Sequence, residues 1–377
     1  MSSRIEQIIE EIEEYAFSGC KALKTITLPA TVKECSPLAF LGCKALEAIA
    51  VAEGNKVYKS VDGVVAVANE EGEFNTIAIY PAGKAGEYAV PAEFKNIADK
   101  AFYDCDALKA VQLSDDLQTI GGRAFENCDV LDSISLPKTL QAIGVSAFEG
   151  TALRTIIIPK SVRNIRDYAF AGTHQYYSSS TPYGSKYRYY GNIKTVTFEK
   201  GSPIKTLSRG VFAGQPISKM VFPDSVTTIG EEALTGIAID SLVIPATVQA
   251  IEAYAFWGGK MKHISMPNSI KNIPKMAFAD CESLLDFTMP TSIETISPHA
   301  FYSCQNLNHI KVSSSVRTIG EEAFADCPNV KKVYTYTLEP VSINQQTFSC
   351  WRTANLYVPN TSYYNYYYNT QWSQFLS

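Results

Sequence analysis

The chain has 377 residues, of which 46% are hydrophobic and 19% are charged, and its formal net charge is −5. This acidic balance argues against nucleic acid and against an anionic membrane surface as partners, because both interactions need a basic face. No run of about 18 apolar residues occurs, so the sequence predicts no transmembrane helix and no direct membrane insertion.

The N-terminal segment, residues 1–22, is predicted to be a part-repeat that begins the fold. Its first residues are amphipathic and acidic, and they lack the apolar core and the small-residue cleavage site of a secretory signal. A cytoplasmic protein and an exported protein whose signal lies outside this sequence both remain open at this point.

One motif recurs along the chain and organises it. It reads L-x-x-I-x-L-P-x-x-V-x-x-I-G-x-x-A-F-x-x-C, and its anchor, usually phenylalanine, returns mostly every 22 or 23 residues. Two intervals are longer, 62 residues after Phe40 and 42 residues after Phe170, and each is interpreted as one or two repeats with an insertion. The anchors are Phe17, Phe40, Phe102, Phe125, Phe148, Phe170, Phe212, Leu234, Phe256, Phe278, Phe301, Phe324 and Phe348.

The spacing within the motif predicts the shape of one coil. In I-x-L, both apolar residues lie on one face of a short strand, and the proline ends that strand because it has no N–H for a ladder. The later apolar residues favour a tight or helical turn, and the glycine is expected to adopt a positive φ. One unit cannot bury its own apolar side, so stacked units should share a core and align their anchors in a column.

The motif resembles that of the BspA-like leucine-rich repeats, and the resemblance extends from about Ile12 to Phe375. It implies an α/β repeat fold: one right-handed leucine-rich-repeat solenoid over residues 1–377, with a parallel β-sheet on one face and short helical or irregular segments in each repeat. Members of this family are mostly bacterial surface proteins, with some in parasitic protists, and are associated with adhesion. The resemblance therefore implies a cell-surface or secreted location.

Residues 50–91 are expected to form an extended repeat with a hairpin insertion. Turn signals at Asp62-Gly63 and Glu71-Gly72 separate strand-like runs at 64–67 and 76–80. A lengthened repeat without a binding role is the favoured interpretation.

Residues 174–190 are expected to form a projecting loop, because they show no apolar period. Tyrosine with serine and glycine is the chemistry of binding loops. The candidate ligand-binding residues are Tyr176, Tyr177, Tyr183, Tyr187, Tyr189 and Tyr190. The alternative is that these tyrosines only pack on the side of the solenoid.

The residue between the isoleucine and the leucine of each strand should face solvent. In the middle of the chain this row is apolar, at Ile157, Val221 and Val243, and exposed apolar patches often mark interaction sites. These residues and the tyrosine-rich segment are predicted to form one ligand-binding site. The alternative is the ordinary preference of strands for β-branched residues.

His263, Asp286 and His309 occupy the same strand position in consecutive units. The register predicts a His–Asp–His row with steps of about 4.8 Å. Charge pairing across strands is the favoured interpretation, and a metal site or a pH-sensitive patch is the weaker alternative. No other metal and no cofactor are expected.

Seven of the nine cysteines lie three residues after an anchor. A single cysteine that recurs at one repeat position is typical of a small buried side chain. Stacked coils would hold the Cβ vectors parallel, which suits disulfides poorly, so thiols are predicted.

Residues 334–377 are predicted to be a C-terminal cap. Tyrosine and tryptophan rings can seal an open core while their polar atoms stay in water. The residues concerned are Tyr363, Tyr364, Tyr366, Tyr367, Tyr368 and Trp372. A ligand site formed by the tyrosines is the weaker alternative.

The sequence shows no catalytic motif such as G-x-x-x-x-G-K-[ST], H-E-x-x-H or G-x-S-x-G. The acidic pairs Glu231-Glu232 and Glu321-Glu322 are expected to begin helical turns, where the helix dipole favours them. The favoured function is non-enzymatic: adhesion to a host protein, a glycan or a neighbouring cell through the solenoid face and the tyrosine-rich loop. A structural spacer or self-assembly scaffold without a specific ligand is the alternative.

Overall fold

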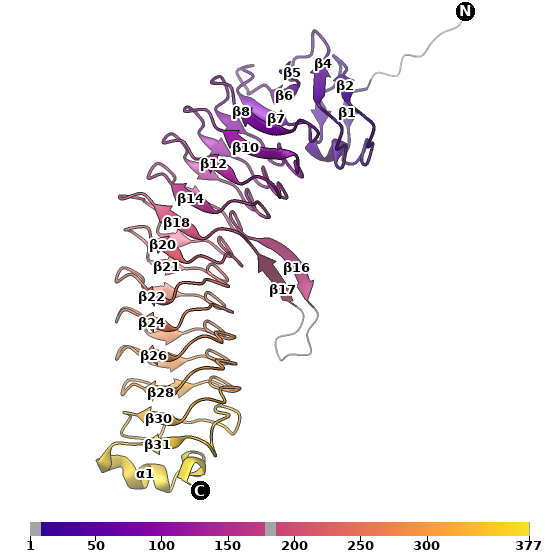
Figure 1. Cartoon of the computed structure of the whole chain (residues 1–377). Helices are drawn as coiled ribbons and strands as arrows, with labels where there is room; N and C mark the ends of the chain where they lie inside the picture. The colour runs from indigo at the N-terminus through magenta and orange to yellow at the C-terminus, as the bar shows by residue number, and fades with distance from the viewer. Residues whose placement is uncertain (1–8, 178–185, 377) are drawn as a thin grey trace, which may run out of the picture. The chain divides into compact units, whose positions relative to one another are not determined.

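The computed structural model describes residues 9–177 and 186–376, and the chain divides into two compact units, residues 1–193 (unit 1) and 194–377 (unit 2). Each unit is a stack of coils in which equivalent strands lie beside one another (Figure 1). The leucine-rich-repeat solenoid expected from the motif is therefore present within each unit. That both units form one continuous solenoid remains a prediction.

The first strand of each coil comes from the I-x-L part of the motif. In unit 1 these strands are β2 (Thr25–Leu28), β4 (Ala48–Val51), β8 (Gly86–Ala89), β10 (Leu108–Gln112), β12 (Ser133–Ser135) and β14 (Thr155–Ile158). In unit 2 they are β18 (Thr195–Phe198), β20 (Lys219–Val221), β22 (Ser241–Val243), β24 (His263–Ser265), β26 (Asp286–Thr288), β28 (His309–Val312), β30 (Lys332–Thr335) and β31 (Asn355–Tyr357).

These first strands pair in parallel and bury alternate residues, as the motif predicts. In β22 and β24, for example, Leu242 and Ile264 are register partners that point into the core, while the residues on either side are exposed. Residues two apart on a strand share a face, so one face of the ladder packs against the core and the other meets water.

Most coils also contain a second strand of two residues, which the sequence analysis did not expect. In unit 1 these strands are β1 (Glu11–Ile12), β3 (Glu34–Cys35), β9 (Asn96–Ile97), β11 (Thr119–Ile120), β13 (Ala142–Ile143) and β15 (Asn164–Ile165). In unit 2 they are β19 (Thr206–Leu207), β21 (Thr228–Ile229), β23 (Ala250–Ile251), β25 (Asn272–Ile273), β27 (Thr295–Ile296) and β29 (Thr318–Ile319). They too pair in parallel from coil to coil.

The turn that follows the second strand is left-handed at two positions and is not helical. Around Phe125, the residues Arg123 and Asn127 have φ values of 56° and 61°. The N–H groups of Arg123, Phe125 and Asn127 donate to carbonyl oxygens of the next coil at 2.7, 2.8 and 2.9 Å, respectively. Glu232 and Glu322 occupy the same left-handed position, so the expectation that they begin helical turns is wrong.

The anchor phenylalanines form a column within each unit, as predicted. In unit 1, ring centroids are 5.2 Å apart between Phe125 and Phe148, with planes 3° apart. In unit 2, Phe301 and Phe324 are 5.2 Å apart with planes at 5°. Each ring is buried by the coils next to it, so no coil completes its core alone.

Tyr80 is an anchor that the sequence analysis missed. Its ring stacks on Phe102 at 4.7 Å, and its N–H donates to Ala101 O at 2.7 Å, as an anchor phenylalanine would. The long interval after Phe40 therefore contains two repeats. The period was hidden because a tyrosine after isoleucine replaces the Ala-Phe pair.

Within residues 50–91, β5 (Tyr58–Val61) and β6 (Val64–Val67) form an antiparallel hairpin. A further strand, β7 (Thr76–Ile79), pairs antiparallel with β6 and parallel with β9. The insertion therefore rejoins the stack through β7, which takes the place of a second strand.

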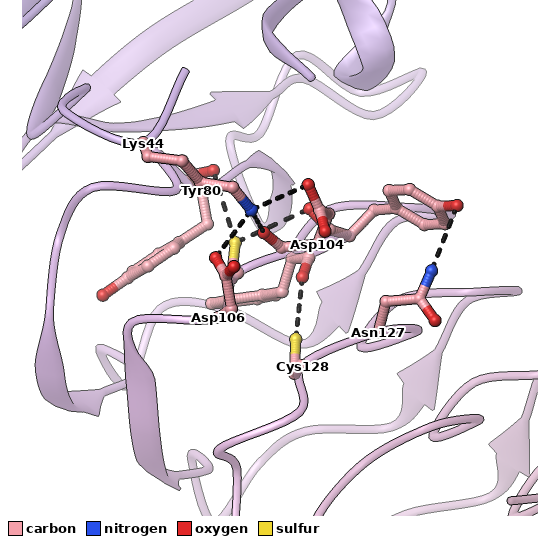
Figure 2. A network of polar contacts seen from close by, with 9 residues as sticks. Lys44, Tyr80, Asp104, Asp106, Asn127 and Cys128 are labelled. Carbon is pink, nitrogen blue, oxygen red and sulfur yellow. Dashed lines mark hydrogen bonds and ion pairs between the residues drawn. The ribbon is translucent and has the colours of Figure 1, made fainter. Parts of the chain in front are cut away.

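A charged network ties the coil before this insertion to a coil after it (Figure 2). Lys44 Nζ donates to Asp104 Oδ2 at 2.9 Å and to Asp106 Oδ1 at 2.7 Å. Burial alone would lower the pKa of Lys44, but the hydrogen bonds with Asp106 and Asp104 outweigh it and raise that pKa. We interpret this network as structural, because it spans the insertion at the edge of the stack.

The cysteines after the anchors are buried and donate hydrogen bonds to the preceding coil. Cys128 Sγ lies 3.0 Å from Phe102 O, and Cys327 Sγ lies 3.3 Å from Phe301 O. Burial raises the pKa of the Cys281 thiol, which lies three residues after Phe278. The prediction of small buried side chains at this position is thus confirmed, with Cys20 as the exposed exception.

The C-terminal cap contains η2 (Asn360–Ser362), α1 (Tyr363–Tyr367) and η3 (Trp372–Leu376). Trp372 and Phe375 are buried against the last anchor, Phe348, at ring distances of 5.7 and 5.5 Å. Trp372 Nε1 donates to Val341 O at 2.7 Å. The predicted cap is confirmed for these rings, and within residues 9–177 and 186–376 α1 is the sole α-helix.

The motif glycines serve close packing between coils and do not adopt the positive φ that the sequence predicted. A Cβ on Gly144 would lie 2.4 Å from Gly122 N, and one on Gly320 would lie 2.4 Å from Pro298 N, and neither glycine has a positive φ. The absence of a side chain is therefore required by the backbone of the neighbouring coil.

We expect Gly144→Ala to lower the free energy of unfolding by about 1–3 kcal/mol, because the methyl group must displace backbone. The matched control is Gly122→Ala, where the nearest atom to an added Cβ is 3.5 Å away, and a change within about 0.5 kcal/mol is expected. Urea denaturation followed by circular dichroism measures both. Equal stability of the two variants would contradict this role.

We expect a thiol reagent such as DTNB to modify one cysteine of the native protein rapidly and all nine after denaturation. Cys20 is exposed, whereas the other eight thiols are buried and shielded from the reagent. Burial also raises the pKa of Cys281, and only the thiolate attacks. Cys20→Ser should remove the fast phase. Rapid modification of several thiols in that variant would show that the stack is not closed.

Candidate ligand-binding surfaces

The tyrosine-rich segment, which the sequence analysis expected to be a projecting loop, contains the two paired strands of a β-hairpin. β16 (Thr173–Tyr177) and β17 (Lys186–Tyr190) pair antiparallel from Thr173↔Tyr190 to Tyr177↔Lys186. They extend from the coils of unit 1 as a two-stranded ribbon (Figure 1). Tyrosine and threonine favour strands, and this preference outweighs the lack of an apolar period.

The described part of the hairpin is its base. Tyr183 and the side chains of Tyr176, Tyr177 and Tyr187 lie outside the described residues. Tyr189 stacks on Tyr168 at 5.9 Å with planes 20° apart, so this ring packs on the side of the solenoid. Tyr190 is 58% exposed.

The base of the hairpin is also held by a buried carboxylate. His174 Nδ1 lies 2.6 Å from Glu149 Oε1, and Glu149 is buried in the coil of Phe148. In the neighbouring coil, burial and the charge of Glu149 raise the pKa of Glu126. The base of the hairpin is therefore fixed to the solenoid by the ring contact of Tyr189 with Tyr168 and by the polar contact of His174 with Glu149.

The outward apolar row is exposed where the sequence places it. In unit 2, Val221 is 45% exposed and Val243 is 66% exposed, and they occupy equivalent strand positions one coil apart. In unit 1, Ile157 on β14 is 53% exposed. Their role in binding, and the single site that would join them to the hairpin, remain predictions.

The His–Asp–His row begins as the register predicted. His263 and Asp286 are register partners on β24 and β26, with His263 Nδ1 3.2 Å from Asp286 Oδ2. His309 pairs with Lys332 on β30. Among residues 9–177 and 186–376, no group of three His, Cys, Asp or Glu side chains is arranged to hold a metal ion.

The outer face of β28 and β30 is cationic. Burial and then the charge of Lys311 lower the pKa of His309, with Lys332 acting in the same direction and Asp286 opposing it. The imidazole is therefore biased towards its neutral form at the surface.

A further aromatic surface lies at the C-terminal end of unit 2, where the sequence analysis favoured a cap over a ligand site. Tyr334 and Tyr357 stack at 4.7 Å on the outward face of β30 and β31. Four tyrosines of the cap, Tyr363, Tyr364, Tyr367 and Tyr368, are also exposed. The helical spacing of the tyrosines indicates this surface, because it places the four exposed tyrosines on one side of a helix and Tyr366 on the opposite side.

Two-stranded coils, a column of anchor rings and a 22- to 23-residue motif define a leucine-rich-repeat solenoid. The family model for the BspA type leucine rich repeat region matches residues 2–60, 95–205, 205–331 and 283–374. The chain belongs to this family, whose repeats occur in bacterial surface proteins and are consistent with a binding or scaffold role.

Several solved structures are similar to this chain, and the first of these supports the fold. A leucine rich cell surface protein from Faecalibacterium prausnitzii A2-165 is 22% identical, with a TM-score of 0.51 over 90% of this chain and 84% of that one. The pneumococcal vaccine antigen PcpA is 26% identical, with a TM-score of 0.40 over 62% of this chain. A leucine-rich repeat protein from Bacteroides ovatus ATCC 8483 is 23% identical, with a TM-score of 0.39 over 76% of this chain and 87% of that one.

The chain spans about half of the PcpA chain, 52% of its length. No protein with a curated description matches the sequence. In the parts of the chain that the structure describes, no helix combines the length and the apolar character that crossing a membrane requires.

We expect Lys311→Gln to raise the pKa of His309 and Asp286→Asn to lower it, because a nearby cation disfavours the imidazolium and a nearby carboxylate favours it. NMR titration of the histidine ring protons measures both changes. Lys271→Gln, which removes a cation paired with Glu294 elsewhere in unit 2, should leave the titration unchanged. A shift of the same size in all three variants would refute the local effect.

Proposed function

We propose that this chain is the ligand-binding module of a bacterial surface protein, and that it binds a protein or a glycan on a cell or matrix surface without catalysing a reaction. The observation that carries the proposal is the exposure of apolar and aromatic side chains at outward positions of a hydrogen-bonded frame. Val243 on the strand face and Tyr190 on the hairpin are 66% and 58% exposed.

The frame supports binding because it keeps these side chains in place before a ligand arrives. A strand that is held in a hydrogen-bonded ladder, as β22 is by β24, loses little backbone freedom on binding, so less of the interaction energy offsets ordering. Val221 and Val243 repeat from coil to coil, which offers an elongated partner equivalent contacts. Burying exposed apolar area contributes about 25 cal/mol per Å².

The family supports the surface location. The solved neighbour from F. prausnitzii is described as a cell surface protein, and we extend that location to this chain as part of the proposal. Catalysis of a polar reaction usually needs a site that excludes water, whereas Val243 and Tyr190 stand open to solvent. Binding is therefore the function that these surfaces support best.

We expect the whole chain to bind at least one member of an array of immobilised matrix proteins and glycans. Val243→Ser and Tyr190→Ala, made separately, should each weaken that binding, and loss of a buried contact at the centre of an interface costs about tenfold or more in Kd. Surface plasmon resonance on the array hit gives the dissociation constants.

Val130→Ser is the matched control, because Val130 is 43% exposed but lies in a turn before β12 and not on the strand face. Binding that is unchanged in both test variants would refute these surfaces. A stable oligomer in light scattering, with no ligand on the array, would favour the spacer or scaffold function instead.

A further inference from the structure

Four tyrosines of the C-terminal cap project into solvent from one side of α1. Tyr363, Tyr364, Tyr367 and Tyr368, here called the cap tyrosines, are 46%, 68%, 48% and 75% exposed. Residues four apart on a helix lie one above the other, and ring contacts between Tyr363 and Tyr364 and between Tyr367 and Tyr368 join the two pairs. The cap tyrosines therefore form one surface, at the end of unit 2 where α1 lies across the last coils (Figure 1).

Closing the core does not explain the cap tyrosines. Tyr366, on the opposite side of α1, is fully buried, and its hydroxyl bonds with Thr335 Oγ1 at 2.9 Å and with Thr337 O at 3.2 Å. Trp372 is fully buried as well. These two rings seal the end of the stack, so the exposed rings are not needed to close the core. Exposed aromatic surface of this kind often marks an interaction site.

The cap tyrosines are ordered by contacts with one another. Tyr363 and Tyr367 have ring centroids 5.9 Å apart with planes at 23°, and Tyr364 and Tyr368 are 6.2 Å apart with planes at 18°. The two pairs meet nearly at right angles, at 81° and 86°. A ligand would therefore meet an array of rings that is already arranged, which lowers the entropic cost of binding.

The surroundings of these rings are polar but uncharged. Residues 353–377 include no Asp, Glu, Lys, Arg or His, while Asn, Gln, Ser and Thr are frequent among them. At the edge of this surface, Asn365 Nδ2 donates to Glu339 Oε1 at 3.1 Å. A carboxylate at the edge disfavours an anionic ligand, and no residue of the segment supplies a cation to pair with one.

We propose that the cap tyrosines bind a neutral polysaccharide. The C–H faces of pyranose rings pack against aromatic rings, and their hydroxyls exchange hydrogen bonds with tyrosine hydroxyls and with side-chain amides. Such a ligand needs no charge on the protein. A charged protein partner would instead leave its own charges desolvated and unpaired at this surface.

This site lies in the cap of unit 2, apart from the strand face and the hairpin on which the proposed function rests. Its presence would give the chain a glycan-binding surface whatever ligand those two surfaces bind. The two proposals can therefore fail independently.

Native gels containing a soluble polysaccharide test the inference on the whole chain. We expect retardation in at least one of four neutral gels, made with laminarin, dextran, mannan or arabinoxylan, and none in gels with hyaluronan or heparin. The variant Tyr364→Ala/Tyr368→Ala should bind about tenfold more weakly or worse, since it removes two stacking rings. Tyr364→Phe/Tyr368→Phe keeps the rings and should retain most of the retardation.

Tyr15→Ala is the matched control, because it removes an exposed tyrosine of unit 1 that belongs to neither proposed binding surface, and it should leave the retardation unchanged. The Ala variant should keep the melting temperature of the parent, since both rings lie outside the core. Absence of retardation in all four neutral gels, equal retardation of the Ala variant, or a preference for the anionic gels would each overturn the proposal. Self-association that the Ala variant abolishes, without glycan retardation, would assign the surface to a second copy of the chain instead.

Discussion

Close backbone contact between neighbouring coils is the constraint on which the structure depends. Turn N–H groups, cysteine thiols and most strands bond to an adjacent coil, as the contacts of Phe125 and Cys128 illustrate. The contact is so close that a side chain at Gly144 has no space. Since a single coil can neither bury its apolar side nor satisfy its backbone groups, the coils fold only as a stack.

The same constraint decides where the chain tolerates extra residues. An insertion is accepted where it leaves the ladder and returns to it, as the hairpin β5–β6 does when β7 restores a second strand and Tyr80 restores the anchor. The hairpin β16–β17 follows the anchor Phe170 and is held at its base through Glu149 and Tyr168. Both insertions are made of strands, because edge backbone groups still need partners.

A rigid frame of this kind separates the residues that hold the fold from the residues that can bind. Inward positions form the shared core. Outward positions such as Val243 and Tyr190 are exposed and do not contribute to that core. The cap divides in the same way within one short helix, where Tyr366 closes the core and its neighbours face water. Binding surfaces can therefore differ among such proteins while the stack is preserved.

The sequence by itself determined the repeat, the column of anchors, the buried face of the first strand, the place of the cysteines and the register that pairs His263 with Asp286. Each of these follows from a local period that is visible in one chain. The tertiary structure decided the second strand, the packing role of Gly144, the anchor role of Tyr80, the hairpin and the split between Tyr366 and the other cap tyrosines. These features depend on contacts between coils some 22 residues apart, and a local pattern cannot reveal which atoms meet across that separation.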